Sequence, residues 1–259
     1  MFALLRRRLR QRLATSGYPA VRESLPEGAR GLPAFEATRC DLNGACAAVC
    51  PTGAITVSTR MALDLGACVA CGRCAEVCVP GALTIAREPA APERSRAALV
   101  IPLTVLAAPD PRAAALAARA RAVLGRSLHV RHLDAGSCNG CDWEINATTN
   151  AVHDLQRFGI DFVASPRHAD VLLVTGTMTR NLELAARRTY DAMGDPRLVV
   201  AVGACAVSGA PYPAGYASGE GAASALPVDV FVPGCPPRPQ AIIDGLLLAM
   251  GRLETRATR

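Results

Sequence analysis

The sequence lacks a long apolar run of the kind that crosses a membrane as a helix. Its longest uncharged apolar stretch, residues 97–108, contains Pro102 and falls short of the roughly 20 residues that span a bilayer. A cleavable apolar signal segment and a nucleic-acid-binding motif are also missing. Much of the net charge of +6 comes from arginines near the amino terminus. The sequence therefore predicts neither a transmembrane helix nor a nucleic-acid partner.

Histidine and tryptophan are scarce, but cysteine is abundant. The 259 residues include four histidines, eleven cysteines and one tryptophan, Trp143, for which packing is the expected role. The odd number of cysteines argues against a disulfide framework, and thiols in a reducing cytosol usually serve metal or redox chemistry. A hydrophobic content of 51% is sufficient for a buried core. We therefore expect a well-packed protein whose cysteines bind metal.

The first seven cysteines follow the bacterial ferredoxin spacing C-x2-C-x2-C-x3-C, written twice. The two copies also share the sequence that follows their last cysteine, C-P-T-G-A-I-T-V and C-V-P-G-A-L-T-I. In such a run three thiolates hold one cluster and the fourth reaches across to the other. The spacing predicts a complete site formed by Cys50, Cys68, Cys71 and Cys74. It predicts an incomplete site formed by Cys40, Cys46 and Cys78, with Asn43 at the position of the missing cysteine.

Structural zinc is the alternative, because paired C-x2-C motifs also hold zinc. Zinc fingers do not use seven cysteines in a duplicated register, so the spacing favours iron-sulfur clusters. At the incomplete site three outcomes remain open. They are a 3Fe-4S cluster, a 4Fe-4S cluster with water, Asn43 or Asp41 on the odd iron, and no cluster.

The other four cysteines, Cys138, Cys141, Cys205 and Cys235, lie beside predicted strands. Apolar or β-branched runs occur at 128–133, 160–164, 170–175, 197–202 and 228–232, and helical patterns at 142–157, 181–193 and 238–251. This alternation predicts a parallel sheet covered on both faces. Since ligands bind beyond the carboxyl ends of such strands, we expect the four thiols to converge on one cluster. Glycines beside them, such as Gly203, would let the backbone approach the cluster closely.

Four segments carry a resemblance to a known family: D-A-G-S-C-N-G-C-D-W-E-I from Asp134, S-P-R-H-A-D-V-L-L-V-T-G from Ser165, V-G-A-C from Val202 and V-P-G-C-P-P from Val232. Residues 120–255 resemble the small subunit of membrane-bound, energy-converting nickel-iron hydrogenases of the formate hydrogenlyase type. These are relatives of the complex I subunit that holds its terminal cluster. That subunit typically has adjacent cysteines where this chain has Cys138-x2-Cys141, so the spacing favours the hydrogenase side.

The front of the chain resembles another subunit of such complexes. The start M-F-A-L-L-R-R-R-L-R, then A-T-S-G-Y-P and the paired cysteine runs are similar to the two-cluster ferredoxin subunit of formate hydrogenlyases. The chain thus looks like a fusion of two usually separate subunits, although Asn43 departs from the family pattern. The expected fold class is α/β, with a two-cluster ferredoxin-like α+β domain and then a flavodoxin-like parallel-sheet domain carrying one iron-sulfur cluster. The expected segments are a basic amphipathic segment 1–30, a ferredoxin-like domain 31–90, a partly helical linker 91–126 and a hydrogenase small-subunit/complex I B-like domain 127–259.

The resemblance implies an electron-transfer subunit of an oxidoreductase complex, with no catalytic centre in this chain alone. It implies two 4Fe-4S clusters and a third cluster that is 3Fe-4S or 4Fe-4S with a non-cysteine ligand. Electrons would come from a donor dehydrogenase or ferredoxin and pass to the metal centre of a large hydrogenase-like or complex I-like subunit. Membrane-arm subunits would hold the chain at the inner, cytoplasmic face of the cell membrane. Relay to a quinone is the alternative end point, and a stand-alone iron-sulfur carrier is a third hypothesis.

Three polar residues are candidate neighbours of the cluster held by Cys138, Cys141, Cys205 and Cys235. Glu144 matches an acidic position beside the cluster in the family, where it would order the partner interface or pass protons; a solvated first-turn carboxylate is the alternative. Arg167 and His168 would hydrogen-bond the cluster surroundings or couple a proton to the electron. For both, a surface role is the simpler alternative.

The amino terminus predicts a basic amphipathic helix. Arginines at 6, 7, 8, 10 and 12 interleave with Phe2, Leu5, Leu9 and Leu13. Such a helix would lie on an anionic membrane or on a membrane subunit. A transit peptide and a solvated tail are the alternatives, and the resemblance favours docking.

Overall fold

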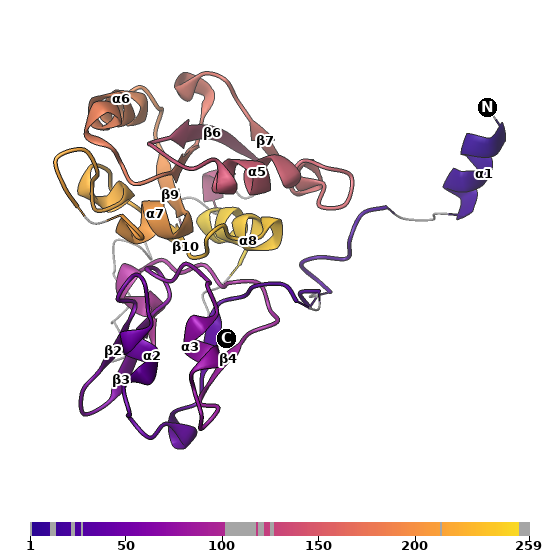
Figure 1. The fold of residues 1–259 in the computed structure, drawn as a ribbon. Helices are drawn as coiled ribbons and strands as arrows, with labels where there is room; N and C mark the ends of the chain where they lie inside the picture. The colour runs from indigo at the N-terminus through magenta and orange to yellow at the C-terminus, as the bar shows by residue number, and fades with distance from the viewer. Residues whose placement is uncertain are drawn as a thin grey trace.

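The computed structural model describes residues 2–10, 14–21, 24–26, 28–101, 118, 122–124, 127–212 and 214–253. Two units follow one another along the chain and lie against each other (Figure 1). We call residues 31–101 the N-terminal unit and residues 127–253 the C-terminal unit. Of the partly helical linker predicted for residues 91–126, the structure describes residues 91–101, 118 and 122–124, and residues 118 and 122–124 are helical.

The N-terminal unit consists of two small antiparallel sheets and two one-turn helices. In the first sheet β1 (Pro33–Phe35) pairs with β4 (Leu83–Ile85); in the second, β3 (Met61–Asp64) lies between β2 (Ile55–Val57) and β5 (Val100–Ile101). The helices are α2 (Ala45–Ala48) and α3 (Arg73–Glu76), and short 3-10 turns occupy η1 (Ala37–Arg39) and η2 (Arg96–Leu99). Both α2 and α3 follow a glycine with a left-handed backbone, Gly44 and Gly72. The two copies of the cysteine spacing therefore share a backbone motif, a left-handed glycine followed by a one-turn helix.

Residues 93–101, which the sequence places in a linker, pack against both units. β5 extends the sheet of the N-terminal unit, and Glu93 forms an antiparallel bridge with Phe231 of the C-terminal unit. Arg94 donates a hydrogen bond to the carbonyl of Leu248. Leu99 is almost fully buried, so the apolar end of this segment is held by the hydrophobic effect. The packed structure thus continues beyond residue 90.

The C-terminal unit is built on a five-stranded parallel sheet in the order β10-β9-β8-β6-β7. Its strands are β6 (Leu128–Asp134), β7 (Ile160–Phe162), β8 (Val171–Thr175), β9 (Leu198–Val202) and β10 (Val230–Val232). Its helices are α5 (Gly140–Ala147), α6 (Arg180–Asp191), α7 (Gly203–Ser208) and α8 (Pro239–Ala249), with 3-10 turns η3 (Leu155–Phe158), η4 (Pro166–His168) and η5 (Ala222–Ser224). The parallel sheet predicted from the alternating pattern is confirmed, and the mixed α/β architecture is consistent with a flavodoxin-like domain.

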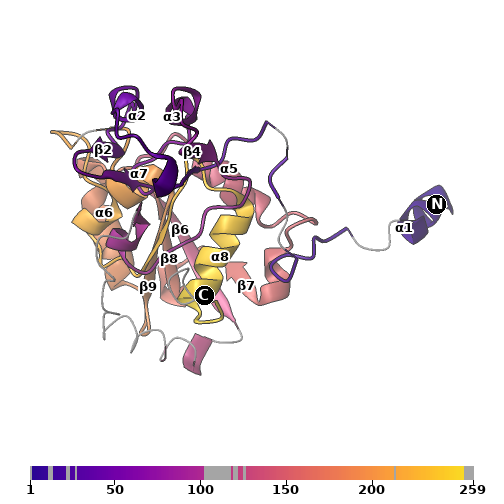
Figure 2. The same ribbon diagram turned by 90° about the horizontal axis from the view of Figure 1, so that it is seen from below.

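Each face of this sheet is covered by different partners. Alternate strand residues pack with α5 and α8 on one face, where α8 runs along the sheet (Figure 2). The intervening residues, such as Leu172 and Val199, pack with α6, α7 and the N-terminal unit on the other face. All residues of β8 and β9 are buried, as expected for strands covered on both sides. The two units thus share one of the two hydrophobic cores.

The helix predicted for residues 142–157 ends ten residues early. Thr148 and Thr149 turn their hydroxyls back to the carbonyls of Ile145 and Asn146, at 2.6 and 2.8 Å. The Asn150 side chain then accepts hydrogen bonds from two following backbone N–H groups. These side chains offer the backbone an alternative to helical bonding, which is why the helix stops.

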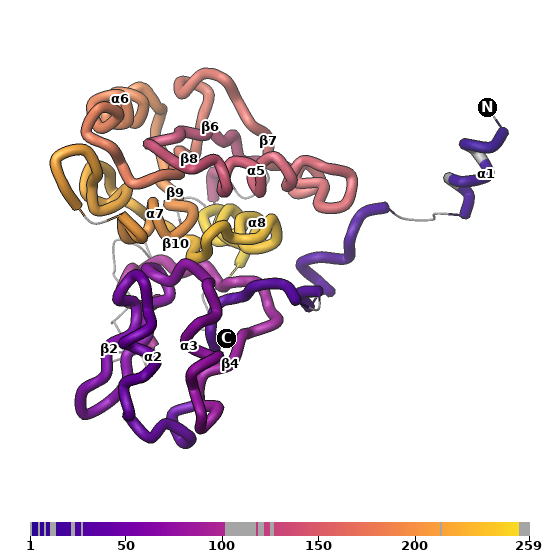
Figure 3. Tube along the Cα trace, viewed as in Figure 1, coloured from indigo at the N-terminus to yellow at the C-terminus, as the bar shows by residue number. Residues whose placement is uncertain are grey.

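The amino-terminal helix α1 (Phe2–Arg10) stands apart from both units (Figures 1 and 2). Beyond it, the chain runs back along the C-terminal unit (Figure 3), where Ser16 donates to the carbonyl of Val152 and Tyr18 is only 2% exposed. Residues 11–13 of the predicted helix lie outside the described residues. None of the helices in the described part of the chain has the length and apolar character needed to cross a membrane.

Candidate iron-sulfur sites

Four thiols meet at the carboxyl edge of the parallel sheet. Cys138 follows β6, Cys141 lies in the first turn of α5, Cys205 lies in α7 directly after β9, and Cys235 follows β10. The charges of Cys205, Cys235 and Cys138 all act on the thiol of Cys141. The structure therefore brings together the four residues that the sequence assigns to one cluster. α7 was not expected, because its six residues immediately follow the strand without a break.

The surroundings of these thiols oppose their ionisation. Burial raises the pKa of Cys141 far above its ordinary value, and the neighbouring cysteines raise it further. Burial also raises the pKa of Cys205 to about 11, again with Cys235 and Cys138 contributing. Four clustered thiolates therefore require a compensating positive charge, which bound iron supplies.

Gly203 leaves space beside the thiol of Cys141. A Cβ at this position would lie 2.5 Å from the Cys141 sulfur, and the backbone φ of +88° is one that side chains rarely adopt. The next residue, Ala204, donates a 2.8 Å hydrogen bond to the carbonyl of Gly234. This bond ties the loop of Cys205 to the loop of Cys235. The cradle thus fits a bulky inorganic group held by all four sulfurs.

A carboxylate that the sequence analysis missed fixes the loop of Cys138 and Cys141. Asp142 accepts hydrogen bonds from Ser137 Oγ at 2.8 Å and Thr175 Oγ1 at 2.9 Å. His132 Nε2 lies 3.1 Å from the same carboxylate. Burial lowers the pKa of His132, and Asp142 opposes that shift. The position directly after Cys141 was the only sequence signal of this role.

The complete site predicted in the N-terminal unit surrounds a cavity. Its lining includes Cys50, Cys68, Cys71 and Cys74, together with apolar residues such as Ile55 and Leu63. Burial raises the pKa of Cys68 to about 12, and the charges of Cys74, Cys50 and Cys71 contribute. Burial acts in the same direction at Cys50, but hydrogen bonds from Thr52, Ala54 and Ile55 outweigh it and lower the pKa of that thiol. The four cysteines thus line one cavity, and the thiol of Cys68 lies close enough to the other three to be affected by their charge.

A second cavity is lined by the cysteines of the incomplete site. Cys40, Cys46 and Cys78 line it together with Asp41 and Asn43. The loop backbone matches that of the complete copy: φ is 58° at Leu42 and 52° at Ala70, and 77° at Gly44 and 81° at Gly72. Left-handed conformations at residues other than glycine cost energy and cluster at ligand sites. The loop with Asn43 therefore keeps the conformation of the loop with Cys71.

The side chain of Asn43 is engaged within its own loop. Its Oδ1 accepts a hydrogen bond from the backbone N–H of Ala45 at 2.9 Å, and its Nδ2 donates to Asp41 Oδ2 at 3.0 Å. Both amide atoms thus have partners that do not belong to the ring of thiols. Asn43 thus forms a local side-chain turn directly before Gly44, the N-cap residue of α2.

In the described ranges, no three histidine, cysteine, aspartate or glutamate side chains are grouped as a site for one metal ion. The four thiolates of a cubane bind four different irons, so its ligands lie farther apart than those of one zinc ion.

The structure places the three predicted neighbours of the cysteines at the carboxyl edge of the sheet in different positions. Glu144 is on α5, where burial raises the pKa of its carboxyl and Arg238 opposes the shift. Arg167 and His168 lie in η4, before β8, and so at the amino edge of the sheet, opposite the thiols. The structure does not place them beside these thiols, because Asp170, two residues after His168, donates its N–H to the carbonyl of His129 at the amino end of β6. The expectation of packing is wrong for Trp143, which is 74% exposed.

Known proteins match the part of the chain that contains this edge. Residues 138–249 match the family model described as NADH ubiquinone oxidoreductase, 20 Kd subunit. The probable membrane-bound hydrogenase subunit mbhJ of Pyrococcus furiosus is 46% identical over 130 residues, which are 50% of this chain and 78% of that protein. The chain belongs to this family. The matched region contains Cys138, Cys141, Cys205 and Cys235, and it begins after the N-terminal unit.

Two further relatives are named as subunits of oxidoreductase complexes. Formate hydrogenlyase subunit 7 of Escherichia coli is 41% identical over 156 residues, 60% of each chain. An NADH-quinone oxidoreductase subunit of Desulfovibrio desulfuricans is 50% identical over 107 residues, 41% of this chain and 58% of that one. The chain thus spans about three fifths of the length of these two relatives. Among solved structures, an archaeal membrane-bound sulfane sulfur reductase matches at 34% identity with a TM-score of 0.45, covering 50% of this chain and 72% of the other.

Proposed function

We propose that this chain is a fused electron-transfer subunit of a membrane-bound hydrogenase complex of the formate hydrogenlyase type. The convergence of four thiols at one sheet edge, in a chain with a hydrogenase subunit among its relatives, carries the proposal. Bound iron-sulfur clusters supply one-electron transfer with little structural change. The chain itself would hold the clusters in position.

Three groups of residues hold the proposed clusters. Cys138, Cys141, Cys205 and Cys235 would hold one 4Fe-4S cluster, and Cys50, Cys68, Cys71 and Cys74 a second. Cys40, Cys46 and Cys78 would hold a third, either 3Fe-4S or 4Fe-4S with a ligand other than cysteine. The two thiol-lined cavities support this division, because each cavity is lined by one predicted group.

Electrons would leave the chain at the edge where Cys138 is exposed. Trp143, one turn along α5, exposes a large apolar side chain beside it. Exposed aromatic side chains are typical anchors of protein interfaces. The large partner subunit with the terminal metal centre would cover this edge, and Glu144 would order the same interface.

Electrons would enter at the N-terminal unit from a donor dehydrogenase or ferredoxin. Val79, directly after Cys78, is 94% exposed, and Leu42 beside Asn43 is also exposed. These apolar side chains flank the incomplete site and would contact the donor. The amino-terminal helix would dock on membrane-arm subunits, so that the chain lies at the inner, cytoplasmic face of the membrane.

A quinone is the second candidate for the final electron acceptor. It is favoured by the 50% identity to a subunit of an NADH-quinone oxidoreductase. The separation of Cys138 and Cys141 by two residues favours the hydrogenase instead, since the complex I subunit resembled here typically has adjacent cysteines. The sequence of the large partner subunit discriminates the two, because four nickel-binding cysteines there indicate hydrogenase.

The relay is tested by removing one ligand of the C-terminal unit. In the complex with its large subunit, Cys205→Ser should lower the iron content and stop electron delivery from a reduced donor. The clusters of the N-terminal unit should still be reduced, because their ligands are unchanged. Iron analysis and electron paramagnetic resonance (EPR) spectra measure both. Unchanged iron content and spectrum in Cys205→Ser would contradict the ligand assignment.

The incomplete site is tested by restoring its missing cysteine. An amide is a poor iron ligand, and both amide atoms of Asn43 are engaged elsewhere, so the parent cluster should differ from the other two. Asn43→Cys should convert it into a cluster with four thiolates and remove the distinct EPR signal. If the parent already shows three equivalent 4Fe-4S clusters, another group completes the site and the assigned register is wrong.

A further inference from the structure

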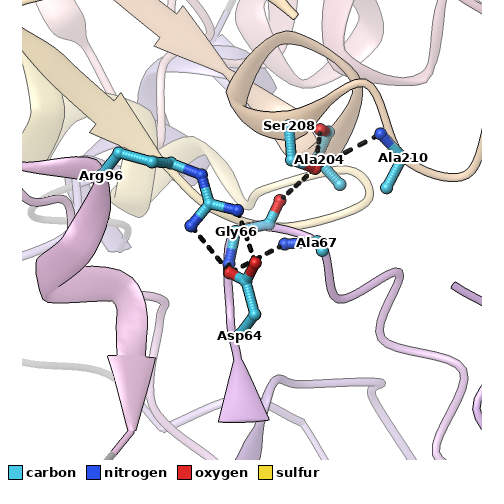
Figure 4. Close-up of polar contacts among 7 residues, drawn as sticks. All are labelled: Asp64, Gly66, Ala67, Arg96, Ala204, Ser208 and Ala210. Carbon is cyan, nitrogen blue, oxygen red and sulfur yellow. Dashed lines mark hydrogen bonds and ion pairs between the residues drawn. The ribbon is translucent and has the colours of Figure 1, made fainter. Parts of the chain in front are cut away.

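The hydroxyl of Ser208 joins the two units where α7 meets the turn that contains Gly66. Ser208 Oγ lies 3.0 Å from the carbonyl oxygen of Gly66 in the N-terminal unit and 3.0 Å from that of Ala204 in its own helix (Figure 4). Its single hydrogen is shared between these two acceptors. The hydroxyl oxygen also accepts a bond from the N–H of Ala210 at 3.3 Å.

Both carbonyls are close to cluster ligands along the chain. Ala204 directly precedes Cys205, and Gly66 lies two residues before Cys68. The path from sulfur to sulfur therefore consists of covalent bonds within each unit and the two contacts made by one hydroxyl. These ligands belong to different sites, one in each unit.

We infer that Ser208 is the positioning residue through which electrons cross between the two units, an inference that rests on the proposed function. One electron leaves the site of Cys50, Cys68, Cys71 and Cys74, which is oxidised, and reaches the site that includes Cys205, which is reduced. No bond is made or broken, and no proton moves. The electron itself comes from the reductant that loads the N-terminal unit. Ser208 contributes two hydrogen-bonding contacts to the route, where the units would otherwise meet through van der Waals contacts alone.

The turn that presents Gly66 is held in place by an ion pair. Arg96 Nη1 and Nη2 contact the two carboxylate oxygens of Asp64 at 2.8 and 2.5 Å. Asp64 Oδ1 in turn accepts bonds from the N–H groups of Gly66 at 2.9 Å and Ala67 at 3.3 Å (Figure 4). The paired contacts fix the direction of the Gly66 carbonyl, because a bidentate arginine constrains geometry as well as charge.

The contact between α7 and the turn of Gly66, which we call the junction, leaves no space for a side chain at residue 66. A Cβ on Gly66 would lie 2.7 Å from Arg96 Nη1 and 2.8 Å from Val207 Cγ1. Val207 precedes Ser208 on α7, so the units are in van der Waals contact where the hydroxyl bridges them. A methyl group here would separate them at the bridge.

The same contacts give the order of the sites. The second cysteine copy lies at the junction, and its residues 69–72 are partly buried, whereas residues 41–43 of the first copy are exposed. The site with Asn43 is therefore the outer one, and the complete site lies between it and the C-terminal unit.

The inference is tested on the full chain with its clusters bound, by photoreduction with a soluble one-electron sensitiser and rapid freezing. EPR then follows reduction of the C-terminal site after reduction of the N-terminal ones. Ser208→Ala should slow this step several-fold with unchanged iron content, because the hydrogen-bonding contacts between the units are then lost at this point. Ser208→Thr, which keeps the hydroxyl, should restore the rate. Gly66→Ala should slow the step further and weaken the magnetic interaction between the two sites.

Gly194→Ala is the matched control, since nothing lies within 4 Å of its added methyl group and its backbone is ordinary. It should behave as the parent does. Parent-like transfer in both Ser208→Ala and Gly66→Ala would overturn the assignment of the bridge while leaving the relay intact. A parent in which the C-terminal site never accepts electrons from the N-terminal unit would overturn the proposed relay, and the bridge with it.

Discussion

Replacing Gly203 with alanine should abolish the cluster site at the carboxyl edge of the sheet. The new Cβ would lie 2.5 Å from the sulfur of Cys141, and the backbone at φ +88° disfavours any side chain. A left-handed conformation costs a residue with a Cβ about 1–2 kcal/mol. Overpacking of a filled interior typically adds about 1–3 kcal/mol. The total of about 2–5 kcal/mol is a large part of the roughly 5–15 kcal/mol that stabilises a typical domain.

The assay for Gly203→Ala is the iron content of anaerobically purified protein, with the EPR spectrum of the reduced form. We expect loss of the iron of one cluster and retention of the iron bound by the N-terminal unit. Gly194→Ala again serves as the control, because its methyl group meets no atom within 4 Å. Full iron content and an unchanged spectrum in Gly203→Ala would refute the reasoning, because they would show that this glycine does not shape the ligand cradle.

Three further predictions concern charge and hydrogen bonding. Burial raises the pKa of Asp229 to about 6 from its ordinary 3.8, so its contribution to stability falls as pH rises through that window. Asp229→Asn should therefore raise the free energy of unfolding by up to about 3 kcal/mol near pH 7.5 and by roughly half that near pH 5. Denaturant titration measures this difference. An equal gain in the free energy of unfolding at both pH values would contradict the prediction. Asp142→Ala should lower the free energy of unfolding by about 1–3 kcal/mol, because Ser137 and Thr175 lose their hydrogen-bond acceptor. A chelator should also remove iron from this variant faster than from the parent. An unchanged rate of iron removal would exclude the role of Asp142 in holding the loop of Cys138 and Cys141. Deleting residues 2–10 should weaken attachment to anionic vesicles or to the membrane complex with iron content unchanged, since each basic residue near such a surface contributes about 1 kcal/mol; unchanged attachment would indicate a solvated tail.

Much of the architecture could be predicted from the cysteine spacing and the pattern of apolar strands. The five predicted strands correspond to β6, β7, β8, β9 and β10, and the rule that ligands gather at their carboxyl ends anticipated the meeting of Cys138, Cys141, Cys205 and Cys235. This worked because the loops that follow the strands of an all-parallel sheet all lie at the same edge, whatever the order of the strands. The duplicated spacing anticipated the two matching loops, since identical intervals between ligands impose similar turns.

Other features depend on contacts that no local pattern contains. α5 ends early because the hydroxyls of Thr148 and Thr149 form hydrogen bonds to carbonyls of the helix. A periodic apolar pattern contains no information on such side-chain bonds, which compete with helical bonding. Arg167 and His168 were assigned from their place in a family motif, although their position before β8 puts them at the opposite edge. The bond between Ser208 and Gly66 joins residues 142 positions apart, so only the packing of the two units reveals it.

In the proposed relay, the position of Asn43 would account for the missing ligand at that site. Its loop keeps the backbone conformation of the complete copy, with matching φ values at Leu42 and Ala70, so the three remaining thiols keep their places. The complete copy is the one whose loop begins at the junction, next to the carbonyl of Gly66 that Ser208 contacts. A substitution at Cys71 would alter the site that passes electrons between the units, whereas Asn43 alters only the outer site. The same substitution in the inner copy, Cys71→Asn, should therefore slow transfer to the C-terminal unit, whereas restoring the outer cysteine with Asn43→Cys should leave that step unchanged. Equal effects of the two changes on the transfer rate would contradict this order of the sites.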